Sequence, residues 1–464
     1  MRPFKTKSRF RDALVENYPI IAILIGVLLV SFSIGLYQNP DTAWEYKAAN
    51  GVIQWGMPYT EVRGSLINQP PLGFYLEGLF LGIFGLSIET GTSLVTIFGL
   101  GCTYLVYRIG KELYNKQTGI IASIMFALTP WELILSRSFL IDTQCLFFSL
   151  LTIYYGILAI RADSHRQFLF AGVAFALGFL TKFYAIFVLF PLALIYVYKK
   201  KVPKQLITQA VVFFIPLIVS LLIWNIIHDW QLPTWLPRGL GYMFNHSDFS
   251  DFNANGVVPS YSFISTFLFD GLGYFFVASF MASLAVGLIF RKQLGKDTTT
   301  YDGIFLLSIL MILGLNMYLG VTQNLKVPYT SAIKYSYQAL PLFSLVAASI
   351  VMKSSTMLKS TNFFSKTRKF LFTIVAVIGL LLIASSLLWG IYDAHELSQM
   401  SFVIFSVQPG VLLGYSFDNF YTIAEGNPVI CMQYAGFLLI LSALIYSYKY
   451  SLIKTWYRLI KKSS

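Results

Sequence analysis

Acidic side chains are scarce in this sequence, and three of them stand beside long apolar runs. Asp41 and Glu45 follow the first run, one helical turn apart, and Asp142 stands at the start of a later run, 140–160. If such runs cross a membrane, ionisable groups at their edges are costly to place and mark functional sites. Since a carboxylate can take the proton of an attacking hydroxyl or amine, Asp41 is the first candidate for a general base. The alternative for Asp41 is an N-cap of a helix that starts near Ala43.

Two basic residues on the same predicted side of the membrane as these carboxylates could hold an anion. Lys182 follows the apolar run 167–181, which as a helix would be roughly 22 Å long, shorter than the hydrocarbon core of about 30 Å. We therefore expect Lys182 to lie in the outer leaflet, at the depth of a lipid phosphate. The alternative is a lysine that snorkels to the headgroups. Arg137 and Asp142 either join the same site, with Asp142 orienting a cation, or simply pair with each other.

The composition predicts the fold class. The 464 residues are 56% hydrophobic and only 12% charged, about half the charged share of a soluble domain. Apolar runs of roughly 20 residues are long enough to cross a bilayer. They predict an all-α, polytopic bundle of about twelve spans. These spans are 19–38, 90–109, 118–136, 140–160, 167–181, 183–198, 206–227, 263–290, 303–321, 335–352, 370–390 and 432–453.

The net charge of +13 reports topology and not a nucleic-acid partner. With these spans, 27 of the 34 lysines and arginines fall on one set of loops. Basic loops stay in the cytoplasm. We therefore expect a multi-pass protein of the cell's inner membrane, with both termini cytoplasmic and Asp41 facing outward.

Loop lengths suggest where ligands are held. Three outer loops are long, 39–89, 228–262 and 391–431. The first contains an apolar stretch, 72–86, too short to span and predicted to lie in the outer interface, and a second predicted helix at 43–55. We divide the chain into a catalytic core, 1–350, and C-terminal spans, 351–464.

Metal and cofactor signals are weak. The three cysteines and four histidines show no ligand spacing. No cofactor is expected; a divalent ion held by Asp41 and Asp142 is the alternative.

Several motifs in one order resemble those of the GT-C glycosyltransferases, closest to the protein O-mannosyltransferase and lipid A aminoarabinose transferase group. The motifs are Asp41, Trp55-Gly56-Met57-Pro58-Tyr59, Gln69-Pro70-Pro71-Leu72, Ser136-Arg137 with Asp142, Gly178-Phe179-Leu180-Thr181-Lys182, and Lys334-Tyr335 followed by Pro341. They cover about residues 38–345. Two positions depart from the family: Thr42 follows Asp41 where Glu is frequent, and Gln69 stands where a branch of the family has a phosphate-binding Lys.

The resemblance implies an inverting transfer of a sugar from a polyprenyl phosphate to a lipid, glycan or protein acceptor on the outer face. It implies catalytic roles for Asp41, Glu45 and Asp142. It implies a donor phosphate site among Lys182, Arg137, Gln69, Lys334, Tyr335 and Arg63, with Arg238 as a further outer cation. A lipid-linked oligosaccharide polymerase or ligase is one alternative function. A transporter or flippase is another, although repeated halves and broken helices are not evident.

Overall fold

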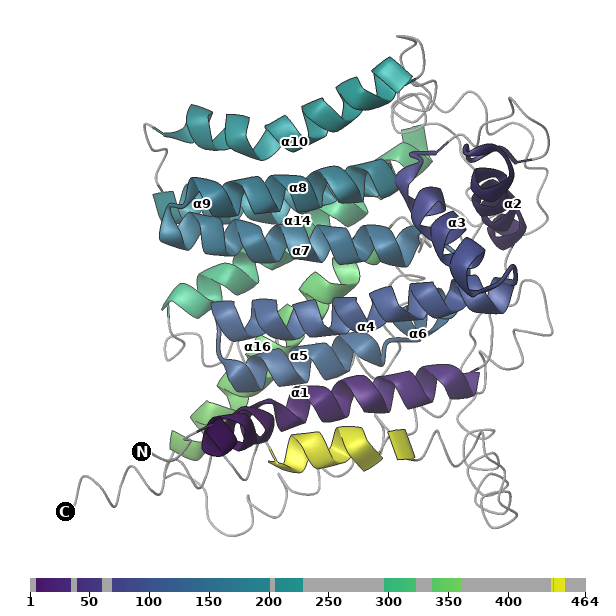
Figure 1. Ribbon diagram of the computed structural model, residues 1–464. Helices are drawn as coiled ribbons and strands as arrows, with labels where there is room; N and C mark the ends of the chain where they lie inside the picture. Colours follow the sequence, from purple (N-terminus) through teal and green to yellow (C-terminus); the bar gives the residue numbers. More distant parts are fainter. Residues whose placement is uncertain are drawn as a thin grey trace, which may run out of the picture.

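The structure, a computed structural model, describes residues 6–34, 40–60, 69–200, 205–227, 296–322, 336–360, 435–436 and 438–446. These residues form helices and contain no strand, which agrees with the predicted all-α class. The helices of the bundle lie side by side, and two further helices, α2 and α3, lie at one end of it (Figure 1). The helices of the bundle are α1 (Thr6–Ile34), α4 (Ile88–Leu113), α5 (Lys116–Ala127), α7 (Asp142–Ala162), α8 (His165–Thr181), α9 (Leu189–Lys200), α10 (Leu206–Ile227), α14 (Lys296–Thr322) and α16 (Leu340–Ser360). The remaining elements are α2 (Pro40–Trp55), α3 (Leu72–Phe84), α6 (Pro130–Leu135) and the 3₁₀ turns η1 (Phe183–Val188) and η5 (Tyr337–Ala339).

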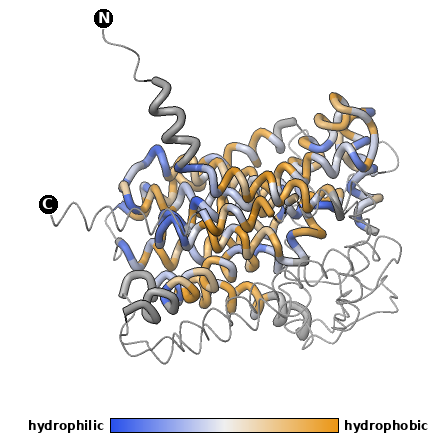
Figure 2. The backbone as a smooth tube through the Cα atoms, turned by 90° about the horizontal axis from the view of Figure 1, so that it is seen from below, coloured by the Kyte–Doolittle hydropathy of each residue, from blue (hydrophilic) through white to orange (hydrophobic). Residues whose placement is uncertain are grey.

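Apolar helices account for most of the bundle. By length and composition, α4, α7 and the Leu206–Trp224 part of α10 are able to cross a membrane, and shorter apolar helices lie beside them. Apolar residues dominate the middle of the helices, and polar residues gather toward their ends (Figure 2). Only 11% of the apolar window of α10 is buried, so this helix offers most of its apolar surface to its surroundings. This arrangement is that of a multi-pass membrane protein.

Two predicted spans differ from the helices found. The span 118–136 is not one helix but two, α5 and α6, because Pro130 begins a new helix and the preceding Thr129 is extended, with φ −69° and ψ 141°. The span 183–198 begins with the tighter turn η1 before α9. The predicted spans 263–290 and 370–390 lie outside the described residues.

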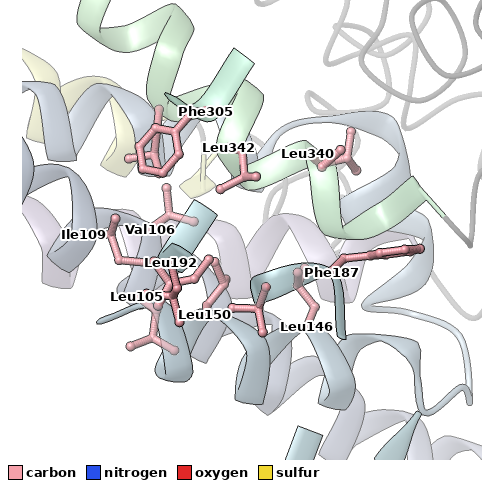
Figure 3. Packing of buried hydrophobic residues seen from close by; sticks show 14 of the residues in the cluster. Leu105, Val106, Ile109, Leu146, Leu150, Phe187, Leu192, Phe305, Leu340 and Leu342 are labelled. Carbon is pink, nitrogen blue, oxygen red and sulfur yellow. The ribbon is translucent and has the colours of Figure 1, made fainter. Parts of the chain in front are cut away.

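The core joins α4, α7, α9, α14 and α16 through aliphatic and aromatic side chains (Figure 3). The cluster includes Leu105 and Val106 of α4, Leu146 and Leu150 of α7, and Phe305 of α14. Close van der Waals packing of this kind holds helices together even where lipid is as apolar as the core.

A polar network ties the far ends of three elements, away from α2 and α3. Tyr114, which ends α4, donates a hydrogen bond to Asp302 of α14 over 2.8 Å. Ser349 and Lys353 of α16 contact the other oxygen of the same carboxylate. The buried Asp302 is thereby compensated, as a buried charge must be.

The helix α3 lies unusually close to its neighbours. A Cβ atom at Gly78 would stand 2.7 Å from the carbonyl oxygen of Ala49 in α2, and one at Gly73 would stand 2.6 Å from the side chain of Ile141. On the other side, Ile83 and Phe84 are exposed. The two segments of the first outer loop that were predicted to be helical, 43–55 and 72–86, correspond to α2 and to α3, which ends at Phe84. Their position in the membrane interface stays a prediction.

Candidate functional site

The helix α2 carries two of the predicted catalytic carboxylates. Asp41 is half-buried and Glu45, one turn later, is only 1% exposed. Residues four apart share a helix face, so both carboxylates belong to the same side of α2. The N-cap alternative for Asp41 is wrong, because α2 begins at Pro40 and places Asp41 inside its first turn. A negative charge there still interacts favourably with the helix dipole.

Glu45 connects α2 to the beginning of α7. Its Oε2 accepts a hydrogen bond of 2.9 Å from the backbone N–H of Ile141, the residue before α7. Backbone N–H groups at a helix start have no partner within the helix, and a carboxylate is a favourable one. Glu45 therefore positions α2 against the turn that presents Asp142.

Asp142 and Lys182 form a buried ion pair. The Lys182 Nζ lies 2.8 Å from Asp142 Oδ2, and the two side chains are 7% and 3% exposed. Lys182 is the extended residue that ends α8, and its N–H donates to the carbonyl of Gly178 over 2.9 Å. The snorkelling alternative is therefore wrong, since the ammonium turns inward to Asp142. The alternative pairing of Asp142 with Arg137 is also wrong, because the partner of Asp142 is Lys182.

Arg137 contacts other elements. Its Nη1 donates to Thr96 Oγ1 of α4 over 3.1 Å, and its guanidinium lies 5.1 Å from the ring centre of Phe32 in α1. The same Thr96 hydroxyl donates to the carbonyl of Ser136. Arg137 is thus buried near the site, on a different set of helices from Lys182.

Two residues of the site were missed by the sequence reasoning. Glu77 of α3 and Gln144 of α7 are fully buried, and Gln144 Nε2 donates to Glu77 Oε1 over 2.9 Å. Burial raises the pKa of Glu77 well above its ordinary value, and the nearby Glu45 and Asp142 raise it further, whereas the bond from Gln144 opposes the rise. A signal was present for Glu77, the one acidic residue in the apolar stretch 72–86. None was present for Gln144.

A second missed pair stands beside the site. The hydroxyl of Tyr337 in η5 donates to Glu132 Oε2 of α6, and both residues are buried. Gln338 of η5 contacts Cys145 of α7 over 3.5 Å. These contacts fix the segment that follows Lys334 and Tyr335 in the sequence.

The other predicted donor-binding residues divide into two groups. Gln69 is half-buried at the entry to α3, and its side-chain oxygen meets no hydrogen-bond donor within the described part of the chain. Arg63, Lys334, Tyr335 and Arg238 lie outside the described residues. Over the ranges described, no group of three His, Cys, Asp or Glu side chains is placed to hold a metal ion.

Known proteins share both the sequence pattern and the fold. Residues 68–224 match the family "Dolichyl-phosphate-mannose-protein mannosyltransferase". The structure is similar to that of ArnT from Cupriavidus metallidurans bound to undecaprenyl phosphate, with a TM-score of 0.53 and 13% identity over 92% of this chain and 76% of that one. The chain has the fold of the GT-C glycosyltransferases. The predicted resemblance is thereby confirmed.

Other GT-C and mannosyltransferase-like proteins extend the comparison. The oligosaccharyltransferase of Archaeoglobus fulgidus, in its apo form, has a TM-score of 0.50 and 14% identity over 84% of this chain and 57% of that one. The proposed mannosyltransferase YkcB of Bacillus subtilis is 26% identical over 223 residues, or 44% of this chain. The matched part spans only 31% of the length of YkcB and, in a second relative, YycA of the same organism, 20%. The matched family region includes the Lys182–Asp142 pair, Glu77 and Gln144, and begins after the end of α2, so it does not contain Asp41 or Glu45.

Proposed function

We propose that this protein is an integral membrane glycosyltransferase that moves a sugar from a polyprenyl phosphate to an acceptor on the extracytoplasmic face, with inversion. The observation that carries the proposal is the buried Lys182–Asp142 pair, placed at the same end of the bundle as the half-buried Asp41. Support for the donor class comes from the family match and from the fold shared with ArnT, which was crystallised with undecaprenyl phosphate.

The chemistry needs one base and one fixed positive charge. A hydroxyl or amine of the acceptor attacks the anomeric carbon of the sugar and gives its proton to the Asp41 carboxylate. The bond between that carbon and the phosphate oxygen breaks, and the electron pair leaves with the phosphate. Because the phosphate leaves as a stable anion, no general acid is required.

Lys182 is the cation proposed for the departing phosphate. A fixed charge stabilises a developing anion most in a site that excludes water, and Lys182 is buried. Its ammonium has three N–H donors, of which Asp142 takes one, so donors remain for phosphate oxygens. Asp142 then acts as the residue that orients the cation. The neutral Gln69 adds at most an uncharged hydrogen bond at the position where a branch of the family has lysine.

The test is transfer by the purified full chain from a labelled polyprenyl-phosphate sugar in lipid. Asp41→Asn keeps the shape of the side chain and removes its ability to take a proton. We expect the rate to fall by roughly 10²–10⁴, the usual contribution of a general base.

The matched control is Lys47→Gln, at an exposed position on the same helix. It should leave the rate near that of the parent. If Asp41→Asn has near-parental activity and unfolds at the normal temperature, Asp41 is not the general base. Its role would then be limited to the favourable interaction of its charge with the start of α2.

A further inference from the structure

Three buried acids and one ammonium meet around the start of α7. Glu45, Glu77 and Asp142 interact with one another, and Lys182 is the ammonium paired within this group. None of these four residues is more than 5% exposed. Among the described residues, Asp142 takes the ammonium, and no cation lies beside Glu77. An ionised Glu77 would be a buried carboxylate without a counter-charge, which is costly unless a proton neutralises it.

The three acids have different hydrogen-bond donors, and this difference indicates which of them is protonated. Asp142 has the ammonium of Lys182 at 2.8 Å, and Glu45 has the N–H at the start of α7 at 2.9 Å. Both partners favour a carboxylate. Glu77 has the uncharged amide of Gln144, and its pKa is raised by burial, by Glu45 and by Asp142. Glu77 is therefore the group that holds a proton most readily.

Within the contact between Glu77 and Gln144, two buried atoms have no hydrogen-bond partner, and one proton satisfies both. They are Glu77 Oε2 and Gln144 Oε1, which no donor reaches within the described residues. With Glu77 ionised, both are acceptors. With a proton on Oε2, the acid can donate to the amide oxygen while the amide donates to Oε1, giving two parallel hydrogen bonds. Unsatisfied buried acceptors are rare in folded proteins, which favours the protonated form.

We infer that Glu77 carries a proton in the resting protein and forms an acid–amide pair with Gln144, and that this pair is a positioning device for the site. Gln144 stands two residues after Asp142, and the nearby Gly73 of α3 allows contact with Ile141. The pair thus fixes α3 against the turn that binds Glu45 and carries Asp142. The positioning role rests on the proposed function; the proton itself does not.

Loss of the proton has a defined consequence for the ion pair. A carboxylate at Glu77 would add negative charge beside Asp142 and compete with it for Lys182. The charged groups facing Glu77 are Glu45 of α2 and Asp142 of α7, with Lys182 of α8 behind Asp142; Glu89 of α4 is exposed. A rise in pH therefore disturbs the position of the ammonium.

Infrared spectroscopy tests the proton without any substrate. The purified protein at neutral pH should show the carbonyl stretch of protonated carboxylic acids, and the difference spectrum between the parent and Glu77→Gln should contain the band of Glu77. The buried Glu132, which is hydrogen-bonded to Tyr337, contributes equally to both spectra. Glu89→Gln removes an exposed acid and should keep the band. A spectrum unchanged by Glu77→Gln would overturn the proton assignment whatever the activity of the protein is.

The pH dependence of stability gives a second test, with a definite sign. Since the pKa of Glu77 is raised on folding, its contribution to stability is complete below the pKa of the unfolded chain. That contribution is lost as the pH rises through the folded pKa. Relative to the parent, Glu77→Gln should lose less stability in alkaline solution. The same loss in both proteins would argue against the proton.

Exchange of the two residues tests positioning. Gln144→Glu alone places a second acid against Glu77 and should lower transfer by about tenfold or more, the size of a strong coupling between residues in contact. The double variant Glu77→Gln/Gln144→Glu restores an acid facing an amide and should recover most of the rate. In Glu77→Gln, transfer should persist and its alkaline decline should weaken. Two results together would reject the positioning role: a transfer rate in Glu77→Gln that falls at alkaline pH as steeply as in the parent, and a double variant whose rate does not recover. If the infrared band still depends on Glu77, the proton assignment would stand.

Discussion

Lys182 is held by its ion pair with Asp142, and its proposed role is to bind the phosphate of the donor. Lys182→Ala should weaken binding of a polyprenyl-phosphate donor more than Gln69→Ala does. A hydrogen bond to a charged group contributes about 1.5–3 kcal/mol, against about 1 kcal/mol for a neutral one. The measurement is donor affinity in lipid nanodiscs.

A control is needed because Lys182→Ala leaves Asp142 buried without its counter-charge, which is itself destabilising. Lys182→Ala combined with Asp142→Asn removes both charges together and separates folding from binding. Donor affinity equal to that of the parent in this double variant would move the phosphate site to another outer cation.

At the scale of single residues, the sequence predicted which residues belong to the site better than it predicted which of them contact one another. Lys182 was expected in the site from its place at the end of a short apolar run, and Asp142 from the resemblance of its motif to the family. Their pairing was not, because the two residues are 40 positions apart and only the packing of α7 against α8 brings them together. Gln144 was invisible for another reason: an uncharged amide inside an apolar helix has no distinctive pattern.

Among the helices, the contact between α2 and α3 depends on glycine. Gly78→Ala should destabilise the protein by about 1–3 kcal/mol, because the new methyl group meets the backbone of Ala49, which cannot turn aside. Gly82→Ala, one turn later and exposed, is the matched control. There the nearest atom is 4.0 Å away, and the gain in helix propensity should stabilise by up to about 1 kcal/mol.

Thermal unfolding in lipid distinguishes the two glycine variants, and transfer assays show whether α3 must stay close to α2. Equal effects of the two substitutions would mean that α2 can move away without cost.

Helices were predicted well where apolar runs were uninterrupted, and less well where the backbone turns within a run. The run 206–227 matches α10. The run 118–136 conceals a break at Pro130, since its residues stay apolar while the proline removes a backbone donor. Hydropathy depends on the polarity of the side chains and does not show where the backbone changes direction.

For the molecule as a whole, the charge distribution predicts which end of the bundle faces outward. Lys47 on α2 and His165 at the start of α8 are both exposed, at opposite ends. In a Cys431→Ser background, Lys47→Cys should react with a membrane-impermeant reagent on intact cells. His165→Cys should react only after permeabilisation.

The background itself is the control, because Cys102 and Cys145 are buried and should stay silent. Reaction at position 165 in intact cells, with none at position 47, would invert the topology and place Asp41 in the cytoplasm.

The connection between α8 and η1, which contains Lys182, is very short. Between the end of α8 at Thr181 and the start of η1 at Phe183 there is a single residue. One inserted residue adds about 3.3 Å of extended backbone, more than the 2.8 Å that separates the ammonium from its carboxylate. An insertion or deletion at this point should therefore separate the ammonium from its carboxylate and leave both charges buried without a partner.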